Sequence, residues 1–136
     1  LVDTSALIAF FINSEKHHPA ARRFVAQHPT ARWLILNTVF DEFVTWTRMR
    51  VSIAASIQLG QVLRAEHPYI YLTGADDAAT WDIFCRYDDK AWSYTDCSLL
   101  ALARRLGVNE VFAFDEHIRQ MAGLGVQCVP LYPSPG

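Results

Sequence analysis

The 136-residue sequence lacks the short motifs that mark several common enzyme classes. It has no GxSxG turn of a serine hydrolase, no GxxxxGK phosphate loop, no GxGxxG dinucleotide loop and no HExxH zinc motif. These absences argue against a serine nucleophile, a P-loop nucleotide, a bound dinucleotide and a zinc-protease centre.

Cysteines are few, and long apolar runs are missing. Cys85, Cys97 and Cys128 are far apart and show no CxxC or Cys/His zinc spacing, so we interpret them as reduced, mostly buried thiols. No apolar run approaches the roughly 20 residues that cross a membrane, and no signal peptide is visible. We therefore expect a cytoplasmic protein without a membrane partner. The chain begins at Leu1 without Met, and its first strand looks shortened, so we expect some upstream residues to be missing.

Charge is also scarce. Charged residues make up 19% of the chain, and the net charge is -2, so no general basic coat is available for nucleic acid. Any contact with phosphates would need a local patch. Arginine pairs at 22–23, 48/50 and 104–105 offer one, although solvated helix surface is the simpler interpretation of each pair. The 51% apolar content predicts a real core and one domain over residues 1–136.

Helical and extended patterns alternate along the chain. Apolar periodicity and capping residues predict helices over residues 4–11, 17–27, 38–50, 52–66, 76–85, 95–106 and 116–122. We expect Thr38 to cap the helix over 38–50, and Gly107 to end the helix over 95–106 in a left-handed conformation. Short apolar runs predict strands over residues 1–3, 33–36, 69–72, 111–114 and 126–131, followed by a loose tail over 132–136. This alternation predicts an α/β fold with three α/β/α layers around a parallel sheet of about five strands.

Four acidic residues lie where the predicted elements begin or end. Asp3 and Asp115 directly follow strands, Asp96 opens a helix, and Glu42 lies one turn into a helix between apolar neighbours that do not mark an obvious surface position. Each acid taken alone has an ordinary explanation as a helix cap or a solvated side chain. In a parallel sheet, however, all of them converge on the carboxyl edge, where sites of such folds form.

A cluster of carboxylates without paired His or Cys ligands suits a hard cation. Mg²⁺ and Mn²⁺ prefer oxygen ligands, and one or two such ions about 4 Å apart hold a phosphodiester and lower the pKa of a bound water. The sequence therefore predicts a Mg²⁺- or Mn²⁺-dependent phosphodiesterase that uses the acids for placement and charge.

Several neighbours of the acids have both a structural and a functional interpretation. Thr4, Ser5 and Thr95 are suited to hydrogen-bond ligands or phosphate, but helix capping is the favoured role for each. His117 follows Asp115 by two residues and is placed to border the site, but we favour a solvent-facing helix residue. The four tryptophans are able to stack on bases, and we interpret them as core.

Three segments carry a resemblance to a known family. Val2-Asp3-Thr4-Ser5-Ala6 looks like the start of a PIN domain, and residues 88–97 with 111–117, which contain YTD and FAFD, resemble the second half of VapC-type toxins. The resemblance implies a PIN fold, a Mg²⁺- or Mn²⁺-dependent endoribonuclease, and the toxin component of a type II toxin–antitoxin pair. It also implies an RNA substrate, a homodimer and a cognate antitoxin that blocks the site.

The family's catalytic and metal-binding acids fall by position on Asp3, Glu42, Asp96 and Asp115. The placement of Glu42 depends on its helix position alone. The alternatives are a non-toxin PIN nuclease, a DNA-directed nuclease of the same fold, and a catalytically silent PIN module that binds RNA or protein. A phosphotransfer receiver fits poorly, because neither Lys16 nor Lys90 follows a late strand.

Overall fold

The computed structural model describes residues 1–131, in which short strands alternate with helices. The helices are α1 (Thr4–Phe11), α2 (His18–Gln27), α3 (Asn37–Arg50), α4 (Ile53–Glu66), α5 (Gly74–Arg86), α6 (Tyr94–Leu106), α7 (Glu116–Arg119) and the 3-10 turn η1 (Ala122–Leu124). The strands are β1 (Ile35–Leu36), β2 (Tyr69–Ile70), β3 (Glu110–Phe112) and β4 (Gln127–Val129). The predicted tail over 132–136 lies outside the described residues.

The strands pair in parallel, as the alternation predicts. β1 pairs with β2, and β3 pairs with β4. The first residues of the chain lie between the two pairs: Asp3 N donates to Phe112 O (2.9 Å), and Val2 N donates to Leu34 O (3.4 Å). The order is therefore β2, β1, the first residues, β3, β4. The strands are only two or three residues long and form two separate pairs, so one continuous sheet of about five strands stays a prediction.

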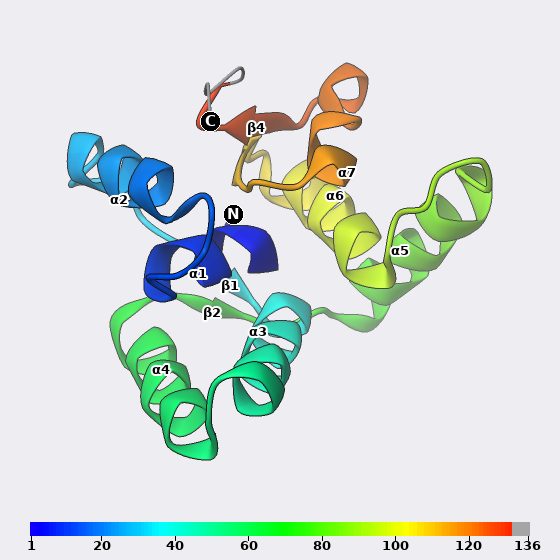
Figure 1. The fold of residues 1–136 in the computed structure, drawn as a ribbon. Coiled ribbons are helices and arrows are strands. Elements are labelled where there is room, and N and C mark those ends of the chain that lie inside the picture. Colours follow the sequence, from blue (N-terminus) through cyan, green and yellow to red (C-terminus); the bar gives the residue numbers. More distant parts are fainter. Residues whose placement is uncertain (132–136) are drawn as a thin grey trace.

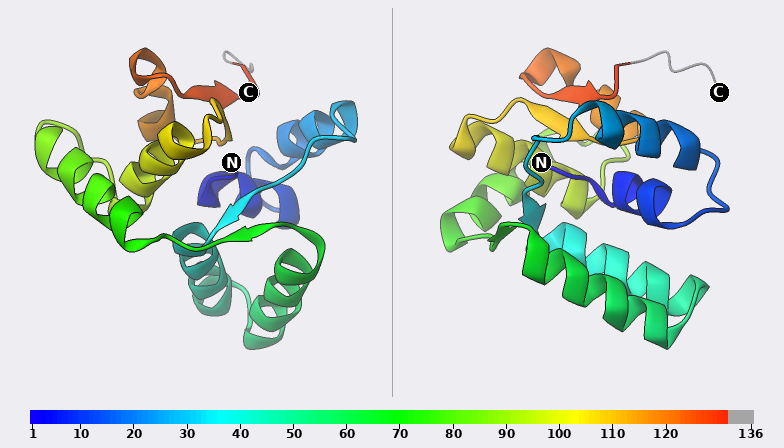
Figure 2. Two further views of the ribbon diagram at one scale, coloured as in Figure 1. Left: turned by 180° about the vertical axis from the view of Figure 1, so that it is seen from behind. Right: turned by 90° about the vertical axis from the view of Figure 1, so that its left-hand side faces the viewer.

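Helices lie on both sides of these extended segments. Figure 1 shows α1 and α2 on one side and α5 and α6 on the other, with the α3–α4 hairpin at one end. The two further views in Figure 2 show the same separation. Within residues 1–131, none of the helices combines the length and apolar character that a membrane crossing requires.

The helix α6 lies in the middle of the core. Eight successive residues, Asp96 to Ala103, are buried, and Gly107 ends the helix in the predicted left-handed conformation at φ 66°. The core around α6 draws on almost every element. Its largest fully buried side chains are Phe43, Leu7, Ile35, Leu36, Leu63, Leu99, Leu100, Leu102, Ile118 and Met121. An acid at the start of such a helix is held in place by packing on several sides.

Some local predictions were wrong. Asp3, rather than Thr4 or Ser5, caps α1 through a hydrogen bond from Ser5 N. Thr38 does not cap α3, because its hydroxyl bonds Ser98 Oγ at 2.9 Å. The bond from Ser5 N to Asp3 is local, whereas the contact of Thr38 with Ser98 is a tertiary one that the local sequence does not reveal.

The prediction of a core position was wrong for one tryptophan and one cysteine. Trp92 is buried, whereas Trp81 is 56% exposed on α5. Cys97 is buried and Cys128 half-buried, but Cys85 is exposed. Trp81 and Cys85 both lie on α5, whose outward side the apolar pattern does not identify.

Candidate metal centre

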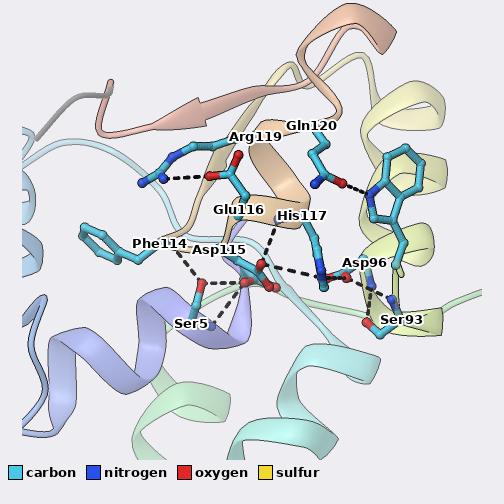
Figure 3. A network of polar contacts seen from close by, with 11 residues as sticks. Ser5, Ser93, Asp96, Phe114, Asp115, Glu116, His117, Arg119 and Gln120 are labelled. Carbon is cyan, nitrogen blue, oxygen red and sulfur yellow. Dashed lines mark hydrogen bonds and ion pairs between the residues drawn. The ribbon is translucent and has the colours of Figure 1, made fainter. Parts of the chain in front are cut away.

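Asp3 is anchored by the residues that follow it. It ends the first extended segment, caps α1, and is only 2% exposed. Its Oδ2 atom accepts hydrogen bonds from Ser5 Oγ (2.5 Å) and Ser5 N (3.2 Å). The same Ser5 hydroxyl accepts a bond from Phe114 N (2.9 Å), as Figure 3 shows. Ser5 therefore links Asp3 to the segment that carries Asp115, although more than a hundred residues separate them.

Asp96 is anchored by a capping box at the start of α6. Ser93 N donates to Asp96 Oδ2 (2.9 Å), and Asp96 N donates to Ser93 Oγ (3.0 Å). This reciprocal pair satisfies two helix-end donors and fixes the direction of the carboxylate. Asp96 is 4% exposed, so it is a buried acid.

Asp115 caps α7 and lies beside a histidine. Its Oδ1 atom accepts a bond from His117 N (2.8 Å). The ring atom His117 Nδ1 lies 3.3 Å from Asp96 Oδ2 and 3.7 Å from Asp115 Oδ1. Ligand atoms of the three residues all lie within 4.8 Å of one another, close enough to surround one ion. Figure 3 shows the His117 ring reaching toward Asp96.

His117 is a site residue that the sequence interpretation underweighted, because we favoured a solvent-facing position over one at the border of the site. The available signal was its place in the first turn of a helix whose cap is itself an acid of the site. That signal did not say on which side of the short helix the ring would lie.

The acids repel one another. Burial, and then the charges of Asp96 and Asp115, raise the pKa of Asp3 to about 7 against the opposing hydrogen bonds from Ser5. Burial also raises the pKa of Asp96, with Asp115 adding to the rise while Ser93 and His117 oppose it. A positive ion among these carboxylates would remove that penalty.

Glu42 is placed differently from the other three acids. Its side chain is exposed, contrary to the inference from its apolar neighbours. Within the described part of the chain, no hydrogen bond or ion pair joins it to another acid. The helix α3, which carries Glu42, contacts α6, because Thr38 on the first turn of α3 bonds Ser98 of α6. Residues four apart share a helix face, so Glu42 follows Thr38 toward that side. Its membership of the cluster stays a prediction.

The threonines beside the acids do not act as the predicted caps. The hydroxyl oxygen of Thr4 is buried and has no hydrogen-bond partner among residues 1–131. Buried polar atoms are nearly always paired. The hydroxyl next to Asp3 therefore has bonding capacity left for a ligand or a water.

The donor set fits a hard divalent cation. Three carboxylates, one spare hydroxyl and one imidazole offer mainly oxygen ligands, which Mg²⁺ and Mn²⁺ prefer. The ring of His117 lies next to Asp96 and Asp115, whereas Lys90 pairs with Asp89 and Arg105 pairs with Asp76.

Comparison with known proteins agrees with this geometry. The model of the PIN domain family matches residues 1–124. The chain belongs to the PIN domain family. Proteins named 23S rRNA-specific endonuclease VapC20, from two strains of Mycobacterium tuberculosis, are 31% identical over 121 residues, which is 84% of this chain and 87% of theirs. The predicted family is confirmed.

A solved structure shows the same PIN fold. The crystal structure of Mycobacterium tuberculosis VapC20, described as a Sarcin-Ricin loop cleaving toxin, superimposes with a TM-score of 0.82. It is 23% identical, and the match covers 93% of this chain and 95% of that one. The predicted α/β PIN fold is confirmed. In this PIN domain, Asp3, Asp96 and Asp115 lie at the carboxyl ends of extended segments or at the start of the helix packed beside them.

Proposed function

We propose that this PIN domain is a Mg²⁺- or Mn²⁺-dependent endoribonuclease that hydrolyses RNA phosphodiester bonds with a metal-activated water. The observation that carries the proposal is a pair of buried acids with raised pKa values, Asp3 and Asp96, with the charge of the half-buried Asp115 contributing to both rises. The names of the VapC20 relatives support RNA as the substrate. The anchored carboxylates argue against a catalytically silent module.

Each residue of the site has a separate task in this proposal. When bound, a divalent ion supplies water activation and neutralises charge on the phosphate. Asp3, Asp96 and Asp115 would hold the ion, each kept in one rotamer by its own hydrogen bonds. His117 joins Asp96 to Asp115 and fixes the spacing of their oxygens.

Glu42 is proposed as the fourth acid, and a matched pair of variants tests it. Glu42→Gln should lower RNA cleavage at least about tenfold if its carboxylate orients a metal ligand or a metal-bound water. Asp41→Asn is the control, because Asp41 is the exposed acid directly beside Glu42. Equal rates for the Glu42 variant and the control would remove Glu42 from the site.

We also propose that the chain is the toxin of a toxin–antitoxin pair, acting in the cytoplasm as a homodimer that a cognate antitoxin inhibits. The description of the structural relative as a toxin supports this role. Expression of the chain alone should arrest growth, and co-expression of a neighbouring open reading frame should restore it. Normal growth with abundant, folded and cleavage-competent protein would favour a non-toxin PIN nuclease.

We further propose that residues 1–136 form one domain, in which the five extended segments act as a single sheet. The hydrogen bonds from Asp3 and Val2 to the neighbouring strands support this arrangement.

Cleavage of total RNA tests the activity directly. The protein is incubated with total RNA in Mn²⁺ or in EDTA, and the new ends are mapped. Discrete ends that appear only with the metal are expected. Intact RNA with folded protein in Mn²⁺ would overturn the proposal, and cleavage of DNA alone would indicate a DNA-directed nuclease.

A further inference from the structure

Two stacked rings lie beside the metal centre and have no role in holding the ion. The imidazole of His17 stacks on the ring of Phe114, with centroids 4.9 Å apart and an interplanar angle of 11°. Phe114 directly precedes Asp115, and its backbone N–H bonds Ser5 Oγ. The position of the stack is therefore fixed relative to the acids.

The stack lies to one side of the carboxylates. Figure 3 shows the Phe114 ring on the opposite side of Asp115 from Asp96 and His117. Both His17 and Phe114 are half-buried, so part of the stacked pair stays open to solvent. A group bound there would lie next to whatever the acids hold.

Positive charge borders the same two rings. Burial lowers the pKa of His17, and the charges of Lys16 and Arg119 lower it further, whereas Glu15 opposes them. The lowered pKa favours the neutral form of His17, which presents an uncharged aromatic ring. Lys16 is exposed, and Glu116 orients Arg119 through an ion pair of 3.2 Å. An aromatic surface next to cations matches a base and its phosphates.

We propose that His17 and Phe114 form a stacking site for one nucleobase beside the scissile phosphate of single-stranded RNA, with Lys16 and Arg119 facing the phosphate backbone. This inference rests on the proposed nuclease function. Single strands are the expected occupant because their bases are free to leave the stack, whereas those of a duplex are not. Stacking on a ring is tolerant of sequence, so the site would position RNA rather than read it.

A fluorescent base reports stacking directly. RNA oligonucleotides carry 2-aminopurine at successive positions and bind, in Mg²⁺, to protein with the Asp96→Asn substitution, which prevents cleavage. Quenching at one position next to the cleavage site is expected. His17→Leu, which fills a similar volume without an aromatic face, should abolish that quenching, and His17→Phe should retain it.

Cleavage kinetics provide the second measurement. In the otherwise native protein, His17→Leu should lower kcat/KM about tenfold, within the range seen when a stacked base loses its aromatic partner. His17→Phe should stay within about twofold of the native value, because stacking and not proton transfer is the task. Thermal unfolding of each variant separates a stacking role from a packing role.

The two lysines of the chain offer a matched test of the charge. Lys16→Ala should weaken RNA binding and reduce the slope of log K against log salt by about one, because one phosphate contact is lost. Lys90→Ala should leave the slope unchanged, since Lys90 lies in the turn after α5, next to Asp89.

The outcomes distinguish this inference from the proposed function. Cleavage with unchanged quenching and rates in His17→Leu would overturn the stacking site and leave the nuclease intact. Position-specific quenching without cleavage by native protein would overturn the nuclease and leave the stacking site. A lower melting temperature with unchanged quenching would show that the rings only pack. If His17→Leu fails to fold, the quenching measured with His17→Phe and the salt dependence measured with Lys16→Ala still test the stacking site.

Discussion

Two buried aspartates occupy the same position in two capping boxes, and they differ in what faces them. Asp76 is the third residue of α5, and Asp96 is the third residue of α6. Asp76 bonds Thr73 as Asp96 bonds Ser93, with distances between 2.9 and 3.1 Å. The exposed fractions are 3% and 4%. Locally, the two residues are equivalent.

Their tertiary partners are opposite. Asp76 accepts bonds from Arg105 Nε (2.6 Å) and Nη2 (3.0 Å). Burial tends to raise the pKa of Asp76, but Thr73 and Arg105 outweigh it, and the net shift is downward. Burial raises the pKa of Asp96 and the charge of Asp115 adds to the rise, while Ser93 and His117 oppose it only in part.

The difference shows how one local motif serves two purposes. An arginine completes the capping box of α5 and makes it a structural ion pair. The capping box of α6 leaves its carboxylate among like charges, which is the environment of a cation site. Only the residue across the fold distinguishes the two.

The largest expected effect is on RNA cleavage, when Asp96 and Asp76 are each replaced by asparagine in separate variants. Asp96→Asn should lower metal-dependent RNA cleavage about a thousandfold or more, because a charged ligand is lost while the amide still accepts the bond from Ser93 N. Asp76→Asn should leave kcat/KM within about twofold but lower the free energy of unfolding by about 1–3 kcal/mol, since the Arg105 pair is lost. Cleavage rates and urea unfolding measure both. Equal losses of activity in two folded variants would break the comparison.

The pH dependence of metal-free stability is the next test. Asp3 has a folded-state pKa of about 7, above its unfolded value near 3.8, so the folded protein binds more protons between those pH values. Stability should therefore fall as pH rises from about 4 to 7, by an amount on the order of a few kcal/mol. Asp3→Asn should remove this fall. The variant should therefore be more stable relative to the native protein at pH 8 than at pH 4.

Urea unfolding in EDTA at a series of pH values measures the Asp3 effect. At pH 8, Mn²⁺ should make the native protein more stable than Asp3→Asn, because the ion stabilises the native site and not the variant. A native protein whose metal-free stability rises from pH 4 to pH 7 would contradict the burial of an uncompensated acid at Asp3.

The smallest expected effect is on the free energy of unfolding, when the ion pair between Arg105 and Asp76 is removed. Arg105→Ala should lower the free energy of unfolding by about 1–2 kcal/mol at pH 7, less than for a fully buried pair because the Arg105 side chain is 44% exposed. The pKa of Asp76 is lowered, so this stabilisation is present above the unfolded pKa near 4 and is lost as pH falls through the folded pKa.

Arg104→Ala is the control for Arg105→Ala. Arg104 is the exposed neighbour, and its removal should change the free energy of unfolding by less than about 0.5 kcal/mol. Urea unfolding at pH 7 and pH 3 measures both variants. An equal effect of the two arginines would show that Asp76 does not depend on its partner.

Much of the fold followed from sequence because local signals determine it. Capping residues and apolar periodicity placed the helices to within a few residues, and Gly107 ends α6 as predicted. Strand lengths were overestimated, since apolar runs mark buried chain but not the length of hydrogen-bonded pairing. Asp3 and Asp115 reached the same edge because parallel strands point one way.

The rest of the site depended on contacts across the fold. The position of His117 depends on how a four-residue helix packs, and the exposure of Glu42 depends on how α3 lies against α6. Ser5 gained its role from Phe114, which is far away in sequence. Periodicity reports which residues share a face of one element, and it does not report what that face meets.

Anomalous diffraction from crystals soaked in Mn²⁺ tests the central claim most directly. A manganese peak is expected among the carboxylates of Asp3, Asp96 and Asp115, with oxygen distances of about 2.0–2.3 Å. Asp76 serves as the internal control, because Arg105 already neutralises it and no peak should appear there. A peak at Asp76, or crystals without manganese at the three acids, would contradict the account.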